Sequence, residues 1–151
     1  MKQRGFTLLE TIIVLAIMTM FFAVSVPLFS KFTERTKLDT SARSIVSTLR
    51  MARTYAITNN KEYYVVFDKQ TDPTRHSYFI SEDGTNPKEK REKLPVGISF
   101  GDLPGSINIY NAGFKATGEF DGSDTSFFVI DAEGDTKTIS VEKTTGRARI
   151  D

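Results

Sequence analysis

The chain has 151 residues and a mass of 16.9 kDa, the size of a single domain. It carries 20 Lys and Arg residues against 19 Asp and Glu residues, and this net charge of +1 excludes a globally basic nucleic-acid-binding protein. The absence of cysteine excludes disulfides, a thiol nucleophile and a cysteine-based zinc site. The single histidine, His76, argues against a histidine-rich metal site.

The N-terminal part of the chain is much more apolar than the rest. Of the 22 residues from Leu8 to Phe29, 17 are apolar and one is charged. As a helix, residues 6–29 would extend about 36 Å, which suffices for a hydrocarbon core about 30 Å thick. Pro27 predicts a kink near the outer end of this transmembrane helix, and Lys2 and Arg4 ahead of it favour a cytoplasmic N-terminus.

Two ordinary interpretations of this segment compete. One is a cleaved secretory signal, for which Ala23-Val24-Ser25 is a passable small-x-small cleavage site. The other is an uncleaved signal anchor. Neither interpretation explains Glu10, because an ionisable residue inside a membrane segment is costly and normally has a partner.

The helical pattern continues beyond the apolar segment. From Phe32 to Ala56, apolar residues recur mostly at spacings of three and four, with polar and charged residues between them. Asn59 and Asn60 suit a helix stop. We therefore expect one helix from Phe6 to about Asn59, whose second part, residues 30–60, is amphipathic and packs on a sheet.

After residue 60 the pattern becomes typical of short strands separated by turns. Residues 69–75 and 87–95 are expected to be loops, and residues 132–135 the turn of a hairpin. The expected strands, mostly antiparallel, are Glu62–Asp68, Ser77–Ser81, Val96–Phe100, Ile107–Tyr110, Phe127–Asp131, Thr136–Glu142 and Arg147–Ile150. The fold class predicted is α+β, with a β-rich domain over residues 61–151.

A specific motif lies at the start of the apolar segment: a short basic leader precedes Gly5-Phe6-Thr7-Leu8-Leu9-Glu10, with Pro27 in register beyond it. This resembles the class III signal of type IV pilins and type II secretion pseudopilins. The resemblance implies that residues 1–5 are a leader, that prepilin peptidase cuts between Gly5 and Phe6, and that Phe6 becomes N-methylated. It also implies that Glu10 pairs with the N-terminal amine of an adjoining subunit and sets the register between helices in a filament.

Weaker motifs in the rest of the chain resemble the GspH/FimT branch of pseudopilins. In order, they are Ala52-Arg53-Thr54-Tyr55-Ala56, Leu94-Pro95, Phe114 to Gly118, and Gly146-Arg147-Ala148-Arg149. The resemblance covers nearly the whole chain. The fold it implies is a long N-terminal helix wrapped by two small antiparallel sheets.

Arg147 and Arg149 are the candidate binding residues of the β-rich domain. In a strand, residues i and i+2 point to the same face, so both guanidinium groups would project together and could contact phosphates. In FimT-type minor pilins, a Gly-Arg-x-Arg is linked to DNA binding during uptake. The alternatives are ion pairs with Asp or Glu side chains, or contact with another subunit.

The other clusters of polar residues in this sequence do not indicate a catalytic or metal-binding site. Asp121 to Asp124 and Asp131 to Asp135 could supply calcium ligands, but their spacing matches no EF-hand loop and such clusters are typical of turns. No nucleophile elbow or nucleotide-binding loop occurs. We therefore predict no enzymatic activity, no metal and no cofactor.

The function implied by the resemblance is that of a minor pseudopilin, a structural subunit of the periplasmic pseudopilus of a type II secretion system. Its helix would cross the inner membrane once and contact other pseudopilins, with the globular domain in the periplasm. The alternative is a FimT-like minor pilin of a type IV pilus that binds DNA for natural transformation. A third hypothesis is a signal-anchored periplasmic domain unrelated to filaments.

Overall fold

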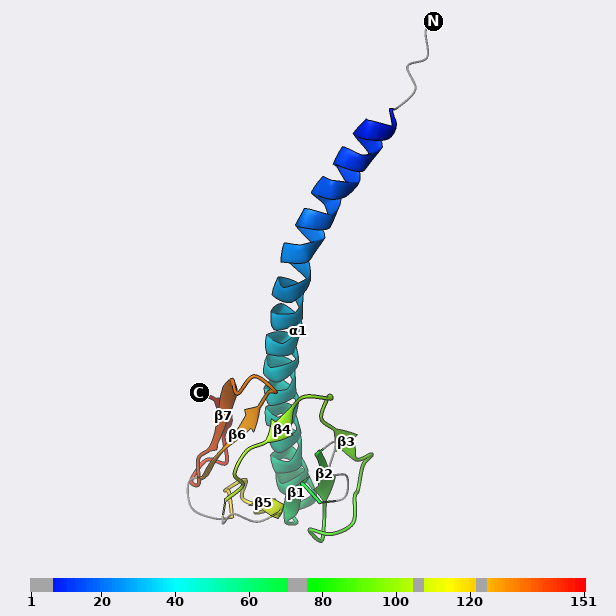
Figure 1. The fold of residues 1–151 in the computed structure, drawn as a ribbon. Helices are drawn as coiled ribbons and strands as arrows, with labels where there is room; N and C mark the ends of the chain where they lie inside the picture. The colour runs from blue at the N-terminus through cyan, green and yellow to red at the C-terminus, as the bar shows by residue number, and fades with distance from the viewer. Residues whose placement is uncertain (1–6, 71–75, 105–107, 122–124) are drawn as a thin grey trace, which may run out of the picture. The chain divides into compact units, whose positions relative to one another are not determined.

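The computed structural model describes residues 7–70, 76–104, 108–121 and 125–151, without the side chains at positions 24 and 26–31. The chain divides into two compact units, Met1–Glu34 and Arg35–Asp151. One α-helix, α1 (Leu8–Asn59), passes through both (Figure 1). The predicted single helix is therefore confirmed over the described residues, whereas Gly5 and Phe6 lie outside them.

The two ends of α1 have identifiable caps. Thr7 precedes the helix, and its Oγ1 accepts a hydrogen bond from the backbone N–H of Glu10 at 3.2 Å, as an N-cap residue does. At the other end, Asn60 has a φ of 51°, and the N–H of Lys61 donates to the carbonyl of Ala56. A left-handed residue just after a helix is a common C-terminal stop, which Asn tolerates better than most residues.

The first unit consists of the N-terminal part of α1, where the described side chains of large apolar residues from Leu8 to Phe22 are exposed. Where side chains are described, no helix meets the length and apolarity needed to span a membrane. The backbone is helical at position 27. The kink at Pro27 stays a prediction.

The second unit contains the rest of α1 and, in the described residues, two four-stranded antiparallel sheets (Figure 1). The first has the order β3-β2-β1-β5, with β1 Tyr63–Asp68, β2 Ser77–Ser81, β3 Glu92–Lys93 and β5 Ile109–Phe114. The second has the order β4-β6-β7-β8, with β4 Ser99–Phe100, β6 Thr125–Ile130, β7 Thr136–Val141 and β8 Ala148–Ile150. The α+β fold with a long helix and two small sheets is confirmed.

The core of the second unit forms between one face of α1 and both sheets. The helix contributes a stripe of buried residues: Leu38, Ala42, Ile45, Leu49, Ala52 and Ala56. Alanine at three of these positions lets strands approach the helix closely. Phe67 of β1 joins the two sheets, because its ring centroid lies 4.7 Å from that of Phe127 in β6 and 5.3 Å from that of Phe100 in β4.

Several predicted boundaries of strands and loops differ from the structure. Of the predicted strand Val96–Phe100, only the last two residues form a strand, β4. The preceding residues form a turn instead, because Gly97 has a φ of 91° and the N–H of Ile98 donates a hydrogen bond to the carbonyl of Pro95. The predicted loop 87–95 contains the short strand β3. The strand β5 extends to Phe114, beyond the predicted Ile107–Tyr110, because residues 109–114 all pair with β1.

Candidate functional site

Three of the four weak motifs, all except Leu94-Pro95, meet at one junction beside α1. The Nε of Arg53 donates a hydrogen bond to the carbonyl oxygen of Gly118 at 3.0 Å. That oxygen lies against Gly146, where an added Cβ would stand 2.2 Å from it. Both glycines have positive φ, 84° and 61°. The Phe-x-x-x-Gly and Gly-Arg-x-Arg motifs therefore place two glycines in contact, with Arg53 against both.

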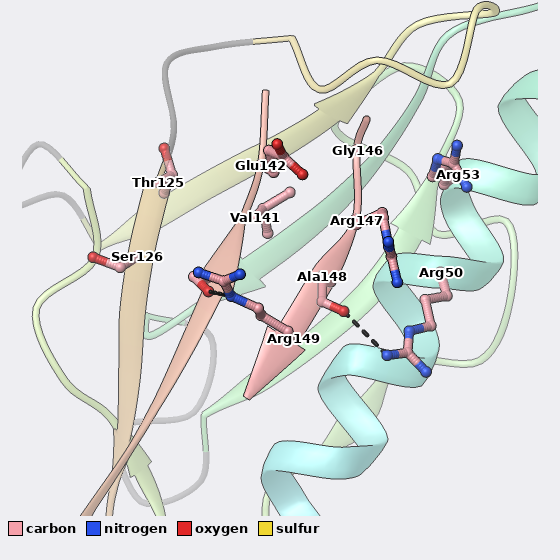
Figure 2. A pocket seen from close by; sticks show the side chains of 11 residues that line it. Arg50, Arg53, Thr125, Ser126, Val141, Glu142, Gly146, Arg147, Ala148 and Arg149 are labelled. Atoms are coloured by element: carbon pink, nitrogen blue, oxygen red, sulfur yellow. Dashed lines mark hydrogen bonds between the residues drawn. The ribbon is translucent and has the colours of Figure 1, made fainter. Parts of the chain in front are cut away.

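A second arginine of α1 holds the strand that follows this junction. The Nη2 of Arg50 donates to the carbonyl oxygen of Ala148 at 3.2 Å (Figure 2). Within the described part of the chain, β8 pairs with β7 on one side only. Arg50 thus satisfies a backbone acceptor on the open side of an edge strand, a common way of protecting such an edge.

These elements border a groove of about 760 Å³. Four arginines line it, Arg50 and Arg53 from α1 and Arg147 and Arg149 from the last segment, together with the hydroxyls of Thr125, Ser126 and Ser140 and the carboxylate of Glu142 (Figure 2). The two arginines predicted from the sequence are exposed and line the same groove, although Arg147 just precedes β8. The contribution of α1 was not predicted.

The two predicted arginines differ in their partners. The Nε of Arg149 lies 3.0 Å from Oδ1 of Asp151 and donates to Oγ of Ser140 at 3.2 Å, while the Arg149 side chain remains 76% exposed. The guanidinium of Arg147 has no hydrogen bond or ion pair with any residue that the structure describes. Arg147 is therefore the better placed of the two to meet a ligand.

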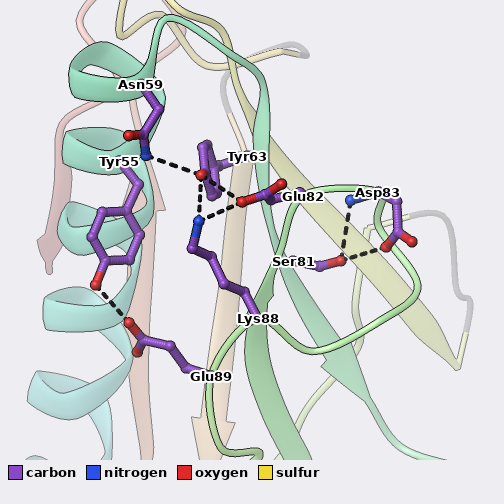
Figure 3. Close-up of polar contacts among 8 residues, drawn as sticks. All are labelled: Tyr55, Asn59, Tyr63, Ser81, Glu82, Asp83, Lys88 and Glu89. Carbon is purple, nitrogen blue, oxygen red and sulfur yellow. Dashed lines mark hydrogen bonds and ion pairs between the residues drawn. The ribbon is translucent and has the colours of Figure 1, made fainter.

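A second polar cluster near the end of α1 holds the loop that follows β2, residues 82–91, in place (Figure 3). The hydroxyl of Tyr63 accepts hydrogen bonds from Nδ2 of Asn59 at 3.0 Å and from Nζ of Lys88 at 2.6 Å, and donates to Oε1 of Glu82 at 2.8 Å. Lys88 also pairs with Glu82, and its Nζ lies 4.7 Å from the centroid of the Tyr63 ring. The hydrogen bond from Lys88 lowers the pKa of Glu82.

Tyr55 and Asp83 make further hydrogen bonds that hold the same loop. The hydroxyl of Tyr55 donates to Glu89 at 2.5 Å, and this bond is the main cause of the raised pKa of Tyr55. Asp83 accepts the backbone N–H groups of Thr85 and Asn86 at 2.8 Å each, which holds its pKa far below the usual range. These contacts hold the loop that follows β2 against the end of α1.

His76 connects the two sheets. Its Nδ1 accepts a hydrogen bond from the backbone N–H of Phe100 at 2.9 Å, and its ring stacks on the Phe100 ring at 5.6 Å. Burial, followed by the charge of Lys69, lowers the pKa of His76. The folded state therefore favours the neutral ring, whose Nδ1 can accept the Phe100 N–H.

The acidic clusters are built into turns where they are described. Oδ1 of Asp131 accepts the N–H groups of Glu133 at 3.1 Å and Asp135 at 2.8 Å. Across the residues that the structure describes, no group of three His, Cys, Asp or Glu side chains could hold a metal ion. Asp124 lies outside the described residues.

The remaining predicted site residues lie in the N-terminal unit. Glu10 is exposed in the first turn of α1, and its carboxylate has no partner among the described residues. Gly5 and Phe6 lie outside the described part of the chain, and the side chain of Pro27 is not described. The roles of all four stay predictions.

The comparisons with known proteins agree on the N-terminus and on the fold. Residues 1–26 match the model of the prokaryotic N-terminal methylation motif. Two curated fimbrial proteins of Pseudomonas aeruginosa are 43% identical over 60 residues, so the match spans 40% of this chain and 38% of the length of these relatives.

Two solved structures share the fold. The type IV minor pilin FimU of Pseudomonas aeruginosa has a TM-score of 0.61 at 18% identity and covers 80% of this chain and 92% of its own. The minor pseudopilin EpsH from the type 2 secretion system of Vibrio cholerae has a TM-score of 0.52 at 16% identity and covers 76% of this chain and 95% of its own.

Proposed function

We propose that this chain is a type IV pilin-like protein that serves as a minor pseudopilin in the periplasmic pseudopilus of a type II secretion system. The single observation that carries the proposal is the combination of a methylation motif over residues 1–26 with a pilin-like fold. In this proposal the subunit has a structural role: it assembles with other subunits through its helix and its surface, and it does not catalyse a reaction.

The N-terminal segment supplies the assembly element. In this proposal, prepilin peptidase removes residues 1–5 and methylates Phe6, and residues 6–29 then cross the inner membrane once. The exposed apolar side chains from Leu8 to Phe22 support this, because so large an apolar surface requires lipid or other helices around it. Residues 30–60 continue the helix, and residues 61–151 form the periplasmic β-rich domain.

Glu10 provides the register contact between subunits. Thr7 already satisfies the backbone N–H of Glu10, and the carboxylate itself has no partner among the described residues. A charge placed among apolar helices is costly unless it is paired. The amine that cleavage creates on Phe6 of an adjoining subunit is the partner that we propose.

The second candidate function is that of a FimT-like minor pilin that captures DNA. The observation that favours it is the guanidinium of Arg147, which has no partner among the described residues and lies in a groove with three further arginines. Against it, Arg149 is paired with Asp151, and Arg50 and Arg53 bond backbone carbonyls of the domain.

Co-assembly tests the proposed function. The full chain is co-expressed with prepilin peptidase and the other subunits of a pseudopilus, and the fraction that co-purifies with them is measured. We expect Glu10→Ala to be processed normally but incorporated several-fold less, whereas Glu10→Asp, which retains the charge, should keep part of the incorporation. Wild-type levels of Glu10→Ala in the assembly would refute the role of Glu10.

A further inference from the structure

The groove beside β8 has a charge pattern that selects among ligands. Among the described residues that line it, four are arginines and one, Glu142, carries a carboxylate. Figure 2 shows these arginines spread from β7 across β8 to α1 rather than gathered around one point. A single small anion would use only part of this surface, so the ligand that fits it is extended and carries several negative groups.

We infer that this groove binds an extended acidic segment of a neighbouring protein subunit. The inference rests on the proposed function, because an assembly subunit needs a docking surface on its globular domain as well as on its helix. Arg147 and Arg149 supply the exposed cations, and Ser126 of β6 adds an exposed hydroxyl to the lining of the groove.

The acidic neighbours of the groove favour a peptide over a nucleic acid. Glu142 lines the groove and Asp151 lies 3.0 Å from Arg149, so any bound chain passes close to two carboxylates. A nucleic acid carries a charge at every phosphate and would be repelled there. A peptide can place a neutral residue beside each carboxylate and a glutamate beside each arginine.

The residue types that line the groove give a second reason to favour a peptide over a nucleic acid. Single-stranded nucleic acids bind through aromatic side chains on which bases stack, in addition to a basic surface. Among the described residues that line this groove, none is aromatic. Guanidinium groups bind carboxylates and phosphates alike, so the lack of stacking side chains in the described lining is what weighs against a single-stranded nucleic acid.

Recognition would use side chains more than backbone. The carbonyl of Ala148, which faces away from β7, already accepts the hydrogen bond of Arg50. An incoming segment therefore finds this acceptor of the β8 edge occupied, and its affinity depends on Arg147 and Arg149. This dependence makes the inference testable by removing two exposed charges that contribute little to folding.

The test measures binding of a defined probe to the full chain in non-ionic detergent. The probe is a fluorescein-labelled peptide of alternating glutamate and serine, and the same peptide with glutamine for glutamate is its neutral counterpart. A labelled oligothymidylate of equal charge is the nucleic-acid probe. The groove variant is Arg147→Gln/Arg149→Gln, and the matched control is Arg35→Gln/Arg43→Gln, which removes two highly exposed arginines outside the groove.

We expect the wild type and the control to bind the glutamate peptide, and the groove variant to bind it at least about tenfold more weakly. Equal binding by wild type and groove variant, or no preference over the glutamine peptide, would overturn the inference. Tighter binding of oligothymidylate than of the glutamate peptide would also overturn it and assign the groove to nucleic acid.

Failure here is separable from failure of the proposed function. Leader cleavage and co-assembly, measured on the same wild-type chain, do not depend on the probe. If the chain is processed and assembled but does not bind the peptide, the inference about the groove is wrong and the proposed function still stands. A chain that keeps residues 1–5 in the presence of prepilin peptidase contradicts the proposed function, whatever its groove binds.

Discussion

The carbonyl oxygen of Gly118 occupies the space into which a side chain on Gly146 would project, 2.2 Å from the ideal Cβ position. Gly146 also has a φ of 61°, and Arg53 fixes the Gly118 carbonyl from the helix side at 3.0 Å. The two glycines therefore tie the start of the last segment to α1 and place Arg147 at the groove.

Gly146→Ala is expected to destabilise the domain by about 1–3 kcal/mol, because the new methyl group meets backbone in a left-handed conformation. Gly134→Ala is the matched control, since its φ is 89° and nothing lies within 4 Å of an added Cβ. Urea unfolding followed by circular dichroism measures both free energies. Equal losses in the two variants would show that the Gly118 contact adds nothing.

Stability should fall as His76 becomes protonated. Burial lowers the folded-state pKa of His76 below its ordinary value of 6.5, so the folded state favours the neutral ring that accepts the Phe100 N–H. The contribution is present above the unfolded-state pKa and is lost as pH falls through about 6.5 toward the lower folded-state pKa. Unfolding free energies measured between about pH 7 and pH 5 test this.

The control for this pH dependence is His76→Gln, whose amide oxygen can accept a hydrogen bond and does not titrate. Its unfolding free energy should change less with pH in that window than that of the wild type. If both proteins lose the same stability between pH 7 and pH 5, His76 does not cause the loss.

Tyr63→Phe should cost about 1–3 kcal/mol, because removal of the buried hydroxyl leaves Asn59, Glu82 and Lys88 without their shared partner. Tyr64→Phe is the comparison, since the Tyr64 hydroxyl bonds the exposed Glu62 at 2.8 Å and its loss should cost less. Amide hydrogen exchange should also show faster exchange in the loop of residues 82–91 for Tyr63→Phe alone. Unchanged exchange there would show that the Tyr63 hydroxyl does not hold this loop in place.

Duplex DNA should not bind the full chain measurably at low salt, since Glu142 lines the groove and the carboxylate of Asp151 lies 3.0 Å from Nε of Arg149, so both would repel phosphates. Titration at two salt concentrations, beside Arg147→Ala/Arg149→Ala, measures this. Salt-sensitive binding that the double variant loses would instead support the DNA-capturing pilin.

Much of the fold could be predicted from local sequence patterns. The spacing of apolar residues predicted α1, and Asn59 and Asn60 predicted its end. Runs of β-branched and aromatic residues predicted β1 and β2 closely, and the hairpin pattern around residues 132–135 predicted β7. The extension of β5 was missed, because Asn111 and Gly113 disfavour strands on propensity. Pairing with β1 overrides that preference, and the Tyr64 ring fills the space beside Gly113.

The site could be predicted only in part. Arg147 and Arg149 stood out because they are two residues apart in a predicted strand. Arg50 is 98 residues from Ala148, the residue it bonds, and no local pattern reports so distant a contact. The bond between Tyr63 and Lys88 spans 25 residues and was missed for the same reason.

The N-terminal mass of the chain, isolated from cells that contain prepilin peptidase, tests the central claim most directly. The account predicts loss of residues 1–5 and a methylated Phe6, and it predicts that Gly5→Ala keeps the leader. An unmethylated chain that begins at Met1 in the presence of active peptidase, or cleavage near Ala23 instead, would contradict the assignment of this protein to a pilin-like filament.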